Sequence, residues 1–216
     1  MIRVYLERGS KKVFACAADW PGWCRSGKDD DAALETLADY AARYRSAISS
    51  ARAGFPKGVD LELEVVERIT GSATTDFGAP GAVPKLDRVA VDEEEARRNV
   101  RILRAAWRTL DDVATGAPAA LRKGPRGGGR DRDKIVAHVR EAEDAYARKV
   151  GVRHKGFDAS DPAAVDALRR DLEKVLGGPS DGRPLGGEKG WPSRYAARRI
   201  AWHALDHAWE IEDRST

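Results

Sequence analysis

Two of the chain's four histidines lie close together near the C-terminus, in the segment Arg199-Ile-Ala-Trp-His203-Ala-Leu-Asp-His207. The segment contains neither Gly nor Pro, and its Ala and Leu residues favour a helix. On a helix, residues four apart lie on the same face, one turn from each other. Two imidazoles at this spacing can bind one metal ion, so the segment is a candidate metal site.

A third histidine, His138, could complete the site. It lies between Ile135 and Ala142 on the apolar stripe of a helix predicted at about residues 131–150. A neutral imidazole on an inner face needs a hydrogen-bond partner or a metal, and a satisfied core histidine is the alternative interpretation. Three histidines with an open position for water or substrate are typical of a catalytic zinc-type centre. The segment is not an HExxH peptidase motif, because Ala204 stands where that motif has its general-base Glu.

Two charged residues of the same helix could act beside the metal. Glu210 falls angularly close to His203 and His207, so it could orient a ligand or transfer protons. The alternative is an exposed carboxylate near the chain end. Arg199 lies one turn before His203 and could bind an anionic group of a substrate or cofactor. The alternative is an ordinary surface arginine.

Four helical stretches without an intervening strand are predicted in the second half of the chain. They cover about residues 92–114, 131–150 and 160–176, and the C-terminal segment after Pro192. Pro162 suits an early helical position, and Gly177 and Gly178 end the third stretch. Four amphipathic helices of this kind predict a four-helix bundle over residues 92–216.

The first 70 residues have a different pattern. Residues 2–6 and 12–18 predict a β-hairpin, a helix begins at Asp29-Asp-Asp31 and continues to about Tyr44, and residues 59–66 alternate like a strand. Residues 71–91 are rich in Gly, Pro and small polar residues and predict a linker, in which residues 85–91 could form a short extended piece. The predicted fold is therefore α+β with two domains, a small module at 1–70 and a bundle at 92–216.

Composition narrows the class of protein. Of 216 residues, 42% are hydrophobic and 34% are charged, which suits a globular protein. The 38 basic and 35 acidic residues nearly balance, so no nucleic-acid-binding signature is present. No apolar run is long enough for a membrane span, and early charges argue against a secretory signal. We therefore expect a cytoplasmic protein with no membrane partner, in which Cys16 and Cys24 are free thiols.

The N-terminal module resembles the HicB-like antitoxin module over about residues 2–50. The resemblance lies in a strand followed by Trp20-Pro-Gly22-Trp23-Cys24, then Ser26-Gly27 and a helix that opens with acidic residues. It implies oligomerisation and, in true antitoxins, a DNA-binding segment and a toxin partner. Because no ribbon-helix-helix or helix-turn-helix segment follows here, the module is interpreted as a homodimerisation or partner-docking element.

The C-terminal part resembles the DinB/YfiT superfamily of metalloenzymes over about residues 92–214. The resemblance lies in a histidine on a second helix, the His203-x-x-x-His207 pair and the amino-acid sequence of residues 197–214. It places the superfamily's three metal-binding histidines at His138, His203 and His207. Characterised relatives include thiol S-transferases and a mycothiol-dependent isomerase, so the resemblance implies a divalent metal and a low-molecular-weight thiol.

The leading hypothesis is a metal-dependent enzyme that acts on a small molecule by thiol transfer, thiol-assisted isomerisation or hydrolysis. Three imidazoles do not select among Zn, Ni and Fe. The alternative is a non-enzymatic metal-binding or interaction protein, in which the N-terminal module mediates self-association or docking. An antitoxin would need a toxin partner and nucleic-acid binding, neither of which the sequence supports.

Overall fold

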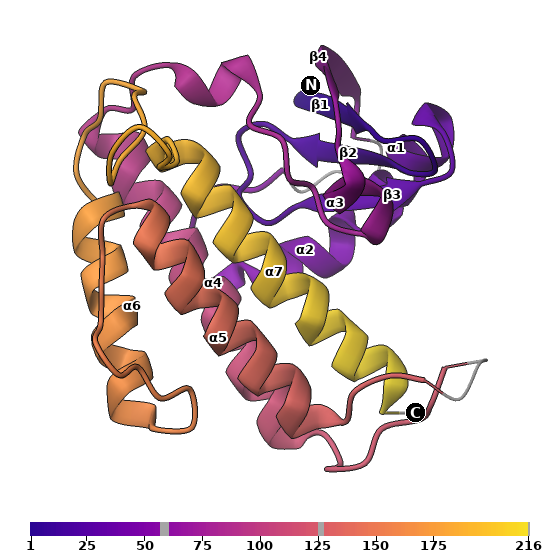
Figure 1. Cartoon of the computed structure of the whole chain (residues 1–216). Helices are drawn as coiled ribbons and strands as arrows, with labels where there is room; N and C mark the ends of the chain where they lie inside the picture. The colour runs from indigo at the N-terminus through magenta and orange to yellow at the C-terminus, as the bar shows by residue number, and fades with distance from the viewer. Residues whose placement is uncertain (57–60, 125–127, 216) are drawn as a thin grey trace.

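The computed structural model describes residues 1–56, 61–124 and 128–215, which form a four-stranded sheet and seven α-helices (Figure 1). The strands are β1 (Ile2–Arg8), β2 (Val13–Ala17), β3 (Cys24–Gly27) and β4 (Leu63–Thr70), in the order β3-β2-β1-β4. β1 pairs antiparallel with β2 and parallel with β4, so the sheet is mixed. The predicted hairpin is confirmed. The strand predicted at 59–66 begins at Leu63, and positions 59 and 60 lie outside the described residues.

Both faces of β1 and β2 are buried. Val4 and Leu6 point to one face and belong to the same apolar cluster as Leu37 of α1 (Asp30–Asp39). On the other face, Phe14 packs edge-on against Trp202 of α7 (Ser193–Arg214), with ring centroids 6.1 Å apart. The C-terminal helix is therefore part of the core of the N-terminal sheet.

The turn between β2 and β3 also contacts α7. Trp23 is fully buried, donates its indole N–H to the Leu37 carbonyl at 2.9 Å and stacks on Tyr44. Gly22 has φ +92, and a Cβ there would lie 2.9 Å from the Leu205 side chain. The glycine is required both by the left-handed backbone and by the close approach of α7.

The other helices are α2 (Ala41–Ala47), α3 (Ala73–Phe77), α4 (Glu93–Gly116), α5 (Arg132–Lys149) and α6 (Pro162–Leu176), with 3-10 turns at Ser49–Ala51 and Lys85–Arg88. The four helices predicted in the second half of the chain are confirmed as elements. α4 and α7 pack against each other, α5 packs on α7, and α6 lies at the outer side (Figure 1).

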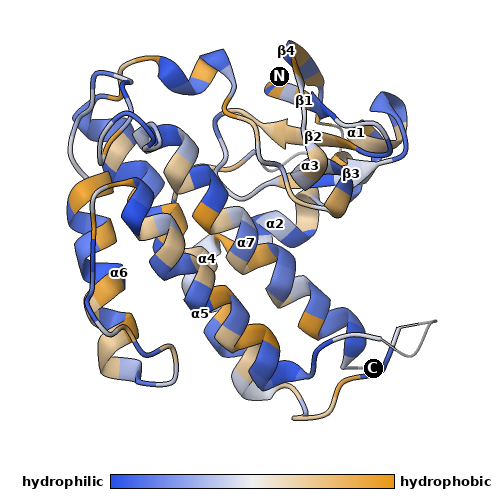
Figure 2. Ribbon diagram, in the orientation of Figure 1, coloured by the Kyte–Doolittle hydropathy of each residue, from blue (hydrophilic) through white to orange (hydrophobic). Residues whose placement is uncertain are grey.

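The predicted fold of a C-terminal four-helix bundle is nevertheless wrong. The structure is α+β, with seven helices among the described residues and a mixed sheet at the N-terminus. One apolar cluster runs from Val4 and Leu37 through Leu103 of α4 to Leu205 of α7, and Figure 2 shows hydrophobic positions on the strands and along these helices. Helical periodicity identifies which face is buried but not which surface covers it, so it could not reveal that the sheet and the long helices share a core.

The segment predicted as a linker contains α3 and the 3-10 turn at Lys85–Arg88, where a short extended piece was expected. Within that turn, Asp87 is fully buried and forms an ion pair with Arg198 of α7. Val91 then forms an antiparallel bridge with Ser180. This segment is thus attached to α7 by a buried charge pair.

The prediction of free cysteines is also wrong. Cys16 of β2 and Cys24 of β3 are direct cross-strand partners with Cα atoms 4.1 Å apart, and they form a disulfide. Antiparallel pairing across a short turn brings the two thiols together, which their spacing in the sequence did not reveal. None of the helices in the described ranges combines the length and apolar character needed to cross a bilayer.

Candidate metal centre

The three histidines selected from the sequence converge. His138 lies on α5, and His203 and His207 lie one turn apart on α7. One ring nitrogen from each lies within 4.8 Å of the other two. The ring centroids are 5.1 Å apart for His138 and His203, 5.2 Å for His138 and His207, and 4.7 Å for His203 and His207. The group could therefore hold one metal ion.

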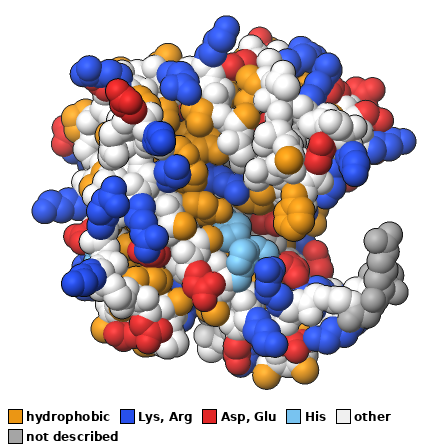
Figure 3. Space-filling view, viewed as in Figure 1, with side chains coloured by type: hydrophobic (Ala, Val, Ile, Leu, Met, Phe, Trp, Pro, Cys, Tyr) orange, Lys and Arg blue, Asp and Glu red, His pale blue; other side chains and the backbone are white. Residues whose placement is uncertain are grey.

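Part of the centre is exposed to solvent. His203 is 6% exposed, whereas His138 and His207 are only partly buried. In the space-filling view histidine atoms are visible in a hollow near the middle of this face, with hydrophobic, basic and acidic side chains around them (Figure 3). A small molecule could reach the histidines through this hollow.

The surroundings favour neutral imidazoles. Burial lowers the pKa of His203 well below its usual value, and the positive charges of His207 and Arg199 act in the same direction. Burial, followed by the charge of His207, also lowers the pKa of His138. A neutral imidazole has the free lone pair that metal binding requires. His138 and His203 could therefore bind a cation near neutral pH.

Glu210 contacts a histidine directly. One of its carboxylate oxygens lies 2.8 Å from Nδ1 of His207, and the other accepts a hydrogen bond from Arg214 at 2.6 Å. The hydrogen bond from His207 lowers the pKa of Glu210, and the Arg214 contact adds to this effect. A carboxylate on Nδ1–H leaves Nε2 of His207 free to bind a metal. Sequence geometry identified Glu210 but not Arg214, although their spacing of four residues was a usable signal.

The donor atoms of the centre suit a metal ion. Nδ1 of His203 is buried and has no hydrogen-bond partner among the described residues. Three imidazole nitrogens this close together form a donor set that a transition-metal ion accepts. The all-nitrogen donor set suits Zn, Ni or Fe rather than Ca or Mg.

Arg199 is buried next to the histidines rather than exposed on the surface. Its guanidinium carbon lies 4.6 Å from the Trp202 ring centroid and 5.4 Å from that of Tyr146 on α5. The Tyr146 ring lies 5.6 Å from the His203 ring. Sequence reasoning did not give Tyr146 a role at the site, although it lies two turns after His138 on the same stripe of α5.

Other polar residues nearby have structural partners. Asp206, which precedes His207, pairs with Arg25 of β3 at 2.7 Å. The fourth histidine, His154, lies 3.0 Å from Asp171 and contributes nothing to the cluster.

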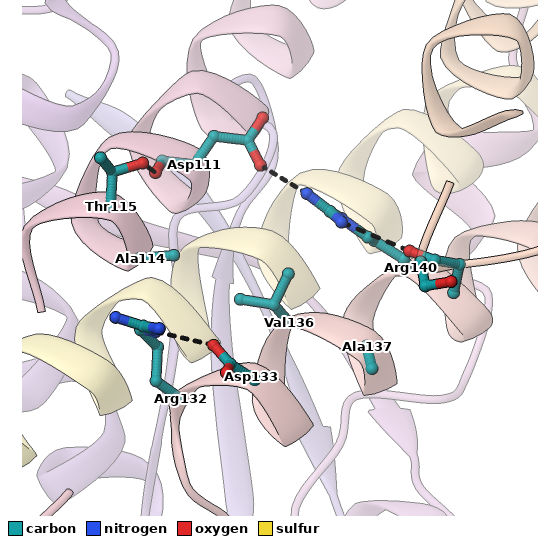
Figure 4. A pocket seen from close by; sticks show the side chains of 10 residues that line it. Asp111, Ala114, Thr115, Arg132, Asp133, Val136, Ala137 and Arg140 are labelled. Atoms are coloured by element: carbon teal, nitrogen blue, oxygen red, sulfur yellow. Dashed lines mark hydrogen bonds and ion pairs between the residues drawn. The ribbon is translucent and has the colours of Figure 1, made fainter. Parts of the chain in front are cut away.

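A separate pocket of about 560 Å³ opens between α4 and α5 (Figure 4). Its charged residues are paired with each other: Asp111 with Arg140, and Arg132 with Asp133. None of the three clustered histidines lines it. The histidine cluster is therefore the better candidate for a functional site.

No family model, no curated protein and no solved structure matches this chain. The interpretation of the site therefore depends on its own geometry.

Proposed function

We propose that the chain binds a divalent metal ion through His138, His203 and His207 and acts as a metal-dependent enzyme on a small molecule. The observation that carries the proposal is the convergence of three imidazoles, in which one ring nitrogen of each lies within 4.8 Å of the other two. Three histidine ligands would leave a coordination position open, as catalytic sites require.

The protein's own groups would each have a defined part. His138 and His203 offer neutral nitrogens because burial lowers their pKa values. Glu210 fixes the orientation of His207 through the Nδ1 contact and could exchange a proton with it. A bound divalent ion would supply Lewis acidity, which lowers the pKa of a water or thiol that joins it.

The reaction class in the proposal comes from the resemblance to the DinB/YfiT superfamily. It comprises thiol transfer, thiol-assisted isomerisation and hydrolysis, with a low-molecular-weight thiol as co-substrate and Zn, Ni or Fe as the metal.

Elemental analysis of the purified protein tests the metal proposal. We expect about one equivalent of metal per chain. The His203→Ala variant should lose the metal, because only two imidazoles would remain to bind it. His154→Ala is the matched control, since it removes a histidine outside the cluster and should keep the metal. Full metal content in His203→Ala would contradict the proposal.

A second measurement separates an enzyme from a metal scaffold. An open coordination position should accept an external ligand, so 2-mercaptoethanol should change the visible spectrum of the Co(II)-loaded protein. A spectrum insensitive to thiol, azide and pH would indicate a closed structural site.

Self-association through the N-terminal module is the second candidate role. The observation that favours it is the edge strand β4, together with exposed Val66 and with Phe77, which is 93% exposed. An edge strand and large exposed apolar side chains can each mark a contact surface. Light scattering of the full chain should show a dimer that Phe77→Asp weakens. A wild-type monomer at high concentration would exclude this role.

A further inference from the structure

We propose that the small molecule bound at the histidine centre carries a carboxylate, and that Arg199 binds it. This inference rests on the proposed function of the same site, which it extends by naming a chemical class of ligand and the residue that selects it.

The first observation is that Arg199 carries an unmatched charge in a buried position. The residue is 9% exposed, and its Nη1 is buried without a hydrogen-bond partner. No hydrogen bond or ion pair to Arg199 occurs in the described part of the chain. Its neighbour Arg198, which is 3% exposed, pairs with Asp87 and donates to the Ala17 carbonyl. A buried guanidinium without an anion is costly, so a missing partner is expected at Arg199 and not at Arg198.

The second observation is that the buried acids on this side already have other partners. Glu7 accepts hydrogen bonds from the Thr75 hydroxyl and from the backbone amides of residues 81 and 82. Glu210 is engaged by the histidine and arginine contacts described above. Since no carboxylate in the described part of the chain pairs with Arg199, the proposed anion is a ligand.

The third observation is the fixed position of the guanidinium. Its carbon lies over the Trp202 ring at 4.6 Å and near the Tyr146 ring at 5.4 Å, which restricts the direction of its N–H groups. Arg199 precedes His203 by one helical turn, about 6 Å along the axis. A molecule only a few carbon atoms long could therefore contact both the guanidinium and the histidine centre.

The direction of approach is also restricted. The cavity that Arg199 shares with Tyr195 and the disulfide measures about 10 Å³, which accommodates about one water. A carboxylate does not fit there, so the proposal places it on the side of Arg199 that faces the histidines. A planar carboxylate with one negative charge matches one planar guanidinium, with which it can form two parallel hydrogen bonds.

The first experiment uses metal-free protein, so it does not depend on the metal proposal. Propionate and its neutral counterpart propionamide are titrated while the guanidinium Nε–H resonances are followed by NMR. The Arg199 signal is assigned by its absence in Arg199→Gln. We expect saturable shifts of this signal with propionate only. An unresponsive Arg199 signal, or equal shifts with the amide, would overturn the inference.

The second experiment uses Co(II)-loaded protein and two thiols of equal length, 3-mercaptopropionate and 3-mercaptopropionamide. Charge-assisted hydrogen bonds should make the carboxylate bind about tenfold or more tightly than the amide. Arg199→Gln should remove this preference and leave amide affinity and Co(II) content unchanged, which also shows that the variant folds. Arg199→Lys should retain only part of the preference, because the planar fork is lost.

Arg130→Gln is the matched control for charge alone. Arg130 is exposed, and its positive charge contributes to the lowered pKa values of His138 and His203. Removing it should change the preference less than about twofold, since solvent screens exposed charges. A larger loss in Arg130→Gln than in Arg199→Gln would contradict the assignment. Failure to bind Co(II) would refute the proposed function alone, because the propionate titration would still decide the role of Arg199.

Discussion

Replacing Arg198 with Met tests whether the sheet, the segment 71–91 and α7 unfold as one unit. Arg198 connects all three parts, since it pairs with Asp87 and donates to the Ala17 carbonyl at the end of β2. Met keeps most of the side-chain length and removes the charge. The variant therefore leaves Asp87 buried without its counter-ion.

The expected loss is large because neither partner is accessible to water. Asp87 is 0% exposed, and its second carboxylate oxygen already lacks a hydrogen-bond partner. Breaking a buried pair from one side costs about 3–5 kcal/mol. For a chain of this length, that corresponds to roughly 6–20 °C in Tm. The double variant Arg198→Met, Asp87→Leu should recover most of the loss, since it removes both charges.

The loss of unfolding free energy in Arg198→Met should also depend on pH. Burial raises the pKa of Asp87 even beside Arg198, and removing the arginine raises this pKa further. The folded-state pKa then exceeds the unfolded value, so the native state binds more protons between the two. The deficit of Arg198→Met relative to wild type should therefore shrink as the pH falls from 7 and grow as the pH rises.

Urea unfolding followed by tryptophan fluorescence and circular dichroism measures this free energy at pH 7.5 and pH 5. A single shifted transition in both signals is expected. If Arg198→Met lost less than about 1 kcal/mol of unfolding free energy, or lost the same amount at both pH values, the proposed contribution of the Asp87–Arg198 ion pair would be refuted. Two transitions, of which only one moves, would show that the sheet and the long helices unfold separately.

Three further results are expected. Gly22→Ala should lower the free energy of unfolding by about 1–3 kcal/mol, because the residue has φ +92 and its Cβ would meet Leu205; unchanged urea midpoints would contradict this. Reducing the Cys16–Cys24 disulfide should cost about 2–3 kcal/mol for its short loop, and a Cys16→Ala, Cys24→Ala variant should be insensitive to reductant. Glu210→Gln should weaken Zn(II) binding about 10- to 100-fold in a chelator competition, and an unchanged affinity would exclude its role in orienting His207.

The site was more predictable from sequence than the fold. The spacing of His203 and His207 fixes their relative placement on any helix, and the apolar stripe of α5 directs His138 inward. Both signals are local and depend only on helical geometry. The structure adds one long-range fact to these local signals, which is that α5 and α7 are neighbours and bring the three histidines together.

Pairings between distant segments could not be predicted in this way. The ion pair between residues 87 and 198, and the cross-strand disulfide between residues 16 and 24, depend on which surfaces meet. The short strand Cys24–Gly27 and the helix Ala73–Phe77 also have too few residues for a period to be visible. Periodicity therefore identified the long helices correctly, but it did not reveal that the sheet also packs against α7.

The central place of α7 explains both why the fold prediction was wrong and where the candidate site lies. From Tyr195 to Leu205 every residue of this helix is buried, because the sheet, α4 and α5 cover different sides of it. Trp202 faces the sheet, while His203 faces α5. Each neighbour restricts rotation of the helix about its axis, and Arg198 is held by its own ion pair. Arg199 and His203 are therefore placed by the packing of the whole molecule, and the proposed binding groups would need little rearrangement to bind a ligand.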